Sequence, residues 1–128
     1  MTPHEQALLF LQKAAQDEAL IDEVLANPRV SDEIIGFHCQ QAVEKLLKAV
    51  LAELAVHTHR THNLRQLIDV LGDQGKALPQ ELQDLDRLTP FAVVWRYGSP
   101  PCPLSLDRRG TRDLVRALRA WAESHVPK

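Results

Sequence analysis

The sequence predicts an all-α fold, an up-and-down bundle of four to five helices that residues 1–128 form as one domain. Two observations support this prediction. Apolar residues recur at spacings of three and four over long segments, which is the period of one helix face. Apolar and polar residues never alternate over a useful length, so no strand is expected. The connections between the helical segments are short, and neighbouring helices are therefore expected to be antiparallel.

The first helix is expected over about residues 3–26. Thr2 is suited to the N-cap and Pro3 to the first helical position, because proline lacks an N–H that would be unpaired there. Asn27–Pro28 should end the helix. Its apolar stripe is predicted to be Leu8, Leu11, Ala15 and Ala19.

The second helix is expected over about residues 32–56, capped by Ser31. Glu44 and Lys48 form an i,i+4 pair that is expected on the solvent side. The apolar stripe is wide, which is typical of a central helix. It consists of Cys39, Val43, Leu46, Leu47, Val50 and Leu54.

Three further helical segments follow a polar loop at 57–63. A short helix over 64–72 should be capped by Asn63, and a fifth helix over about 106–125 by Asp107. Between them a helix starts near Pro79, and Pro90 must kink or split it because proline lacks the N–H and clashes with the preceding turn. Inward-facing positions are Leu82, Leu85, Leu88, Phe91, Val94 and Trp95, then Leu114, Leu118, Trp121 and Ala122.

Composition narrows the class of protein. Hydrophobic residues make up 45% and charged residues 25% of the chain, which is an ordinary balance for a folded soluble protein. Lys48 and Glu53 interrupt the longest apolar-rich run, so no membrane span is expected. No signal peptide is evident, and Cys39 and Cys102 form no spaced motif. These features favour a reduced, cytoplasmic protein, although a disulfide between the two cysteines is possible.

His57, His59 and His62 lie together in the polar loop. A zinc site is one interpretation, but structural zinc sites usually take four ligands at paired spacings, and no second pair lies nearby in the sequence. The other interpretation is a polar loop in which one histidine packs or caps. We therefore expect no metal site and no cofactor.

The last helix carries arginines on one face. Residues 107–128 have six Lys/Arg and three Asp/Glu, while the rest of the chain is acidic overall. Steps of four, four and three place these arginines together, with Arg109 adjacent. The face is either solvated or a site for an anion such as RNA phosphate, because arginine binds phosphate through two hydrogen bonds. The face consists of Arg108, Arg112, Arg116 and Arg119.

Arg96 and Tyr97 stand where an apolar run stops before Gly98. A guanidinium at such a corner can hold an anion. It can equally cap the last carbonyls of its helix while Tyr97 packs on the core. The sequence contains no glycine-rich phosphate loop and no paired catalytic carboxylates.

Several segments resemble the HEPN family, named for nucleotide binding in higher eukaryotes and prokaryotes. The segments are "QQAVEKLLKAVL" at 40–51, "THNL" at 61–64 and "LTPFAVVWRYGS" at 88–99. The resemblance implies a bundle of four or five helices, usually a homodimer, that often accompanies a minimal nucleotidyltransferase. It also implies one of two activities: metal-independent RNA cleavage by toxins of toxin–antitoxin pairs, or nucleotide binding by members without the cleavage motif.

The family's cleavage motif is an arginine followed by four to six residues and a histidine. Arg96 matches the arginine, but no histidine follows at that spacing, and Gly98–Ser99 replaces the family's Pro–Asp. Arg119 and His125 match by spacing alone, about 120° apart on one helix. The prediction is therefore a binding or regulatory protein that holds nucleotide or RNA phosphate through Arg96, Tyr97 and the arginine face. The alternatives are a ribonuclease completed by another histidine, of which His62 leads His57, His59 and His38, or a purely structural dimerisation module.

Overall fold

A computed structural model describes residues 1–58, 60–97 and 104–128, with the backbone alone at 94–97. Its described residues form helices and no strand, so the predicted all-α class is confirmed. No helix among them is long and apolar enough to cross a membrane. The elements are α1 (Pro3–Val24), α2 (Asp32–Glu53), α3 (Leu64–Asp73), the 3₁₀ helix η1 (Gln80–Leu88), α4 (Thr89–Tyr97) and α5 (Arg108–His125).

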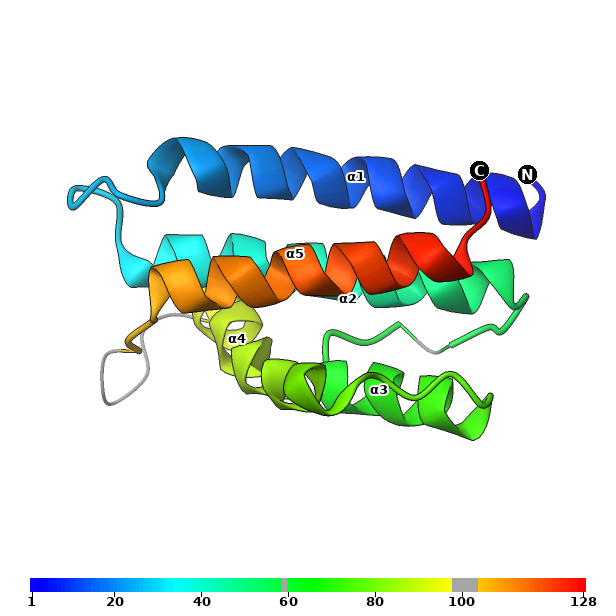
Figure 1. The fold of residues 1–128 in the computed structure, drawn as a ribbon. Coiled ribbons are helices and arrows are strands. Elements are labelled where there is room, and N and C mark those ends of the chain that lie inside the picture. The colour runs from blue at the N-terminus through cyan, green and yellow to red at the C-terminus, as the bar shows by residue number, and fades with distance from the viewer. Residues whose placement is uncertain (59, 98–103) are drawn as a thin grey trace.

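Helix α2 lies at the centre of the bundle (Figure 1). Helix α1 packs antiparallel along it, as the short turn between them predicts, and α5 lies beside both in the same direction as α2. Helices α3, η1 and α4 cover the remaining side of α2. Helix α3 runs in the same direction as α2, so the antiparallel prediction is wrong for this pair. The connection between them runs back alongside α2, and the carbonyl of His62 accepts a hydrogen bond from Gln40 there.

The predicted caps are present at the starts of four helices. The side chains of Thr2, Ser31, Asn63 and Asp107 each accept a hydrogen bond from a first-turn backbone N–H. Helix α2 ends three residues earlier than predicted, because Ala55 adopts a left-handed conformation with φ 57°. The N–H groups of Ala55 and Val56 then bond back to Ala52 and Leu51, which closes the helix end.

The buried face of α1 differs from the predicted stripe. Of the four predicted residues only Leu11 is buried, while Leu8, Ala15 and Ala19 are exposed. The face that packs on α2 and α5 is rotated and contains a carboxylate, which a search for apolar periodicity passes over. It consists of Ala7, Leu11, Ala14, Glu18 and Ile21.

The fourth segment is split as Pro90 predicts. Helix η1 ends at Leu88, and Pro90 is the second residue of α4, where its missing N–H breaks no bond. Helix α4 crosses α2 closely, since a β-carbon at Gly36 would lie 2.3 Å from the ring of Phe91. The side chains of the predicted core residues Val94 and Trp95 lie outside the described part of the chain.

The rest of the predicted core is largely confirmed. Most of the α2 stripe is buried, as are Leu82, Leu85, Leu88, Leu118 and Ala122. Leu54, Leu114 and Trp121 are half-buried and pack against the core. Glu44 pairs with Lys48 at 3.0 Å, but its carboxylate is buried rather than on the solvent side.

Candidate functional site

Arg96 and Tyr97 form the last turn of α4. This end of α4 and the beginning of α5 lie at the end of the bundle opposite the two chain termini (Figure 1). The side chains of Arg96 and Tyr97 lie outside the part of the chain that the structure describes. Their predicted contact with an anion therefore stays a prediction, with the backbone placing them at a helix end.

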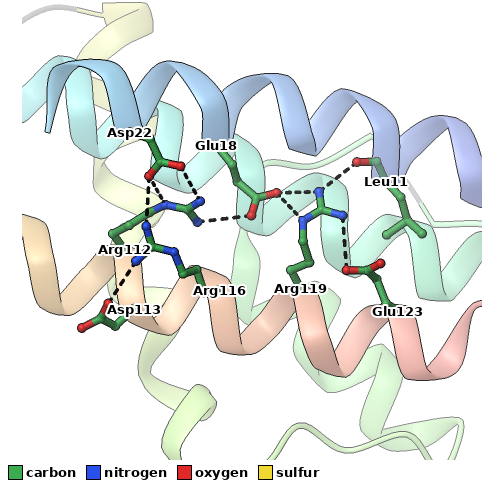
Figure 2. A network of polar contacts seen from close by, with 8 residues as sticks. All are labelled: Leu11, Glu18, Asp22, Arg112, Asp113, Arg116, Arg119 and Glu123. Atoms are coloured by element: carbon green, nitrogen blue, oxygen red, sulfur yellow. Dashed lines mark hydrogen bonds and ion pairs between the residues drawn. The ribbon is translucent and has the colours of Figure 1, made fainter.

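Arg112, from the arginine face of α5, is buried against two carboxylates of α1 (Figure 2). Its Nε and Nη2 donate to the two oxygens of Asp22 at 2.6 and 3.0 Å, and its Nη1 donates to Glu18 at 3.2 Å. The hydrogen bond from Arg112 lowers the pKa of Asp22, and the same bond raises that of Arg112. Arg112 is thus a bidentate link between two helices.

Arg119 and Arg116 extend this link in both directions (Figure 2). The Nε of Arg119 donates to Glu18 at 2.7 Å, and its Nη2 donates to the carbonyl of Leu11 at 2.9 Å. Arg116 is more exposed and donates to Asp22 at 3.3 Å and to Asp113 at 3.2 Å. Glu18 and Asp22 therefore each hold two arginines.

Arg108 stabilises the turn between α1 and α2 through hydrogen bonds. Its Nε donates to Asp32 at 2.6 Å, and its Nη1 donates to the carbonyls of Leu25 and Asn27, each at 3.0 Å. Its Nη2 donates to the carbonyl of Val30. These carbonyls follow the end of α1, where no further helical turn supplies N–H donors, and Arg108 donates to them instead.

The sequence left two interpretations of the arginine face, a solvated surface or an anion site. The structure brings Arg108, Arg112, Arg116 and Arg119 together, and gives all four carboxylate partners on the same chain. Arg109 is exposed and has no hydrogen-bond or ion-pair partner among the described residues. Phosphate binding by this helix stays a prediction, and Arg109 and Arg116 are its most accessible guanidinium groups.

A second polar cluster lies where the connection to α3 runs along α2. His62 Nδ1 lies 2.9 Å from an oxygen of the buried Glu44. Gln40 donates to the same oxygen at 3.1 Å and to the backbone carbonyl of His62 at 3.2 Å, and Lys48 donates to the other oxygen at 3.0 Å. Burial opposes the ionisation of Glu44, but the hydrogen bonds from His62, Lys48 and Gln40 outweigh it and lower its pKa.

The remaining histidines are dispersed. His4 pairs with Glu53 at 2.6 Å and His38 with Asp17 at 3.0 Å, while His57 is exposed. His59 lies outside the described residues. Among those that are described, no three His, Cys, Asp or Glu side chains lie together in an arrangement that could hold a metal ion.

His125 does not complete a site with Arg119. Its Nδ1 lies 2.8 Å from the carbonyl of Trp121 on its own helix, whereas Arg119 reaches across to Glu18 on α1. The two side chains thus have separate partners. This arrangement agrees with the angular separation that the sequence predicts.

The sequence did not predict the carboxylates that hold the arginines of α5 or the carboxylate that holds His62. Glu18 and Asp22 read as ordinary polar residues of α1, and Glu44 as a solvent-facing partner of Lys48. One signal was available: Glu18 and Asp22 are spaced by four, as are Arg108, Arg112 and Arg116, so two charged stripes of opposite sign have the same repeat. That signal predicts that the helices pair, but not which arginine meets which carboxylate.

The described residues form an all-helical bundle on a central α2, with a buried Glu44 that holds the partly exposed His62 and with Arg96 at the end of α4. The sequence model of the HEPN domain family matches residues 6–124. The chain therefore belongs to the HEPN family, as its sequence motifs predict. No curated protein and no solved structure matches it.

Proposed function

We propose that this chain is a HEPN-type binding and regulatory protein that holds nucleotide or RNA phosphate without cutting it. The observation that carries the proposal is the absence of a histidine from residues 97–103, directly after Arg96. Metal-independent RNA cleavage needs a proton acceptor for the 2′-hydroxyl group, and histidine is the natural one near neutral pH. An arginine stays protonated and serves only to hold phosphate.

Phosphate binding on this proposal centres on Arg96 and Tyr97, with Arg109 and Arg116 on α5 as accessible cations. Arg108 and Arg112, which the sequence placed in the same set, already donate to Asp32 and to Asp22. Their substitution would disturb packing as well as binding. Arg96 and Arg109 are therefore the informative positions for a binding experiment.

The test is the binding of a labelled single-stranded RNA at several salt concentrations. Each phosphate neutralised on a single strand contributes about 0.7 to the slope of log K against log salt concentration. Arg96→Ala should weaken binding and lower that slope by about 0.7. The matched control is Arg87→Ala, which removes the same charge from an exposed arginine on η1. RNA binding that is absent at low salt, or equally strong in Arg96→Ala, would contradict the proposal.

We further propose that the protein is a cytoplasmic homodimer and pairs with a minimal nucleotidyltransferase in a toxin–antitoxin-like system. The α2 stripe is no reason for a dimer, because most of it is buried within one chain. Leu20 and Ile34, which are 42% and 39% exposed, flank an apolar groove between α1 and α2 that a second copy could cover. Light scattering should give twice the chain mass, and a gene for the nucleotidyltransferase should adjoin this one.

The Glu44–His62 pair favours a second candidate, a metal-independent ribonuclease. A buried carboxylate that holds one ring nitrogen leaves the other for proton transfer, and His62 is 41% exposed. His62 lies next to the start of α3, whose Leu64 N–H donates to Thr89 at the first residue of α4. Arg96, by contrast, is in the last turn of α4. The two candidates differ in whether RNA is cut when a metal chelator is present.

A further inference from the structure

Helices α1 and α2 pack along their whole length (Figure 1). The arginines of α5 reach Glu18 and Asp22 on one flank of α1 (Figure 2). The other flank of α1 carries residues at alternating steps of three and four, and none of them is buried. They are Phe10, Lys13, Asp17, Leu20 and Val24.

Helix α2 shows the same repeat on the side that adjoins this flank. Its row consists of Ile34, His38, Gln41, Lys45, Lys48 and Ala52, and none of these is buried either. Asp17 of α1 joins the two rows, because it lies 3.0 Å from His38 Nδ1 and accepts a hydrogen bond from Lys45. A row at steps of three and four keeps facing one partner helix along its length, as in coiled coils. We call the two rows together the open face, since no described part of the chain buries them.

One end of the open face is an apolar pocket of about 250 Å³ between the last turns of α1 and the first turns of α2. Every lining residue except His38 is apolar, and the exposed Leu20 and Ile34 are among them. An apolar cavity of about 150 Å³ holds a benzene ring, so this pocket has room for one large apolar side chain.

The rest of the open face is basic. Residues 1–53 contain four Lys or Arg and nine Asp or Glu, yet three of the four basic residues and only one of the nine carboxylates lie on the open face. Lys13 is exposed and has no hydrogen-bond or ion-pair partner among the described residues. The one carboxylate, that of Asp17, is 11% exposed and is already held by His38 and Lys45. The open face therefore presents positive charge to solvent on a helix pair that is otherwise acidic.

These features favour a helix of another protein over a second copy of this chain or a nucleic acid. In a symmetric dimer across this face the lysines of the two copies would meet, and like charges in contact oppose association. A nucleic acid would neutralise the lysines but leave the apolar pocket in water. An amphipathic helix with an apolar side chain at one end and carboxylates along its middle matches both parts of the face.

We propose that the open face is the docking site for an acidic amphipathic helix of a partner protein. An apolar side chain of that helix fills the pocket between Leu20 and Ile34, and its carboxylates contact Lys13, Lys45 and Lys48. The segment 10–24 of α1 is about 21 Å long at about 1.5 Å per residue, so the partner helix has about four turns. The open face contains neither Arg96 nor a residue of α5, so the proposal is independent of the RNA site. A homodimer of this chain would use another surface.

The probe is a fluorescently labelled synthetic peptide of about 18 residues with Leu at heptad positions a and d and Glu at e and g. Fluorescence anisotropy at low salt should show one peptide bound per chain. Leu20→Asp should weaken binding at least about tenfold, because it places a carboxylate in the apolar pocket. Lys13→Glu should weaken binding about three- to fivefold, as expected for an exposed charge pair.

Each variant has a matched control. Leu8→Asp changes an exposed leucine of the same helix outside the open face, and Arg87→Glu reverses an exposed charge on η1. Both should bind the peptide as wild type does, and circular dichroism should show the same helix content in all four variants. A peptide with Lys in place of every Glu should not bind, and an acidic peptide of the same composition in scrambled order should bind weakly.

No binding of the amphipathic acidic peptide, or binding that Leu20→Asp leaves unchanged, would overturn the proposal. Equal binding of the scrambled peptide, or displacement of the amphipathic one by single-stranded RNA, would show a site for anions in general and refute the helix. Light scattering in which Leu20→Asp converts a dimer to a monomer would assign the pocket to a second copy and equally refute it.

Discussion

Replacing Arg112 with methionine tests whether the link between α5 and α1 stabilises the fold. Methionine fills a similar volume, so the change removes the charge and its hydrogen bonds from a side chain that is 6% exposed. Glu18, which is 5% exposed, would keep only Arg119 as its partner. Asp22 is 43% exposed and would be hydrated. The cost therefore arises mainly at Glu18.

Breaking a buried ion pair by removing one partner typically costs about 3–5 kcal/mol. Because Arg119 still holds Glu18, we expect the lower end, about 3 kcal/mol in the free energy of unfolding. For a chain of this length that corresponds to a fall in Tm of about 10 °C. Urea unfolding followed by circular dichroism measures the free energy, and a thermal scan gives the Tm.

A second variant separates charge from packing. Adding Glu18→Leu to Arg112→Met removes the stranded carboxylate, and apolar replacement of a whole buried pair is often neutral or stabilising. The double variant should therefore be more stable than Arg112→Met alone. Arg109→Met, on the exposed side, should change stability by less than about 0.5 kcal/mol. A cost below about 1 kcal/mol for Arg112→Met, or a double variant that is less stable than the single one, would refute the reasoning.

Three further predictions concern stability. Arg112 lowers the pKa of Asp22. The pair therefore stabilises the fold above about pH 4, where an unfolded aspartate is ionised, and this stabilisation is lost as the pH falls below that value. In urea titrations, Asp22→Asn should be less stable than wild type at pH 7 and should lose less stability on acidification. Gly36→Ala should cost about 1–3 kcal/mol in the same assay, because its methyl group would overlap the ring of Phe91, and an unchanged midpoint would mean that α4 does not pack there. Ala55→Gly should raise the free energy of unfolding by about 1 kcal/mol, because φ 57° strains alanine but not glycine, and a loss of stability would contradict the left-handed turn.

Local signals predicted the helices well. The caps at Ser31, Asn63 and Asp107 depend on side chains that bond within their own first turn, so the sequence contains all that is needed to place them. The end of α2 was harder to predict from the sequence. Ala55 is a strong helix former and no Gly or Pro follows it directly, so only the left-handed conformation of Ala55 shows that the helix has ended.

The candidate site was predicted only in part. Spacing on α5 correctly predicts that its arginines share a face, but Asp22 lies 90 positions from Arg112 in the sequence. Which residues meet depends on how α1 rotates against α5, and Glu18 occupies a core position that apolar periodicity does not register. The Glu44–His62 contact was missed for a similar reason, because it requires the loop after α2 to run back along that helix.

The measurement that tests the central claim most directly is incubation of labelled single-stranded RNA with the purified protein in the presence of a metal chelator. Wild type, Arg96→Ala and His62→Ala are compared. The account predicts that the RNA stays intact with all three proteins, because no histidine is among the seven residues that follow Arg96 and general acid–base catalysis, worth about 10²–10⁴ in rate, is missing. Cleavage by wild type that either substitution abolishes would contradict the account and show that His62 or another histidine completes a ribonuclease site.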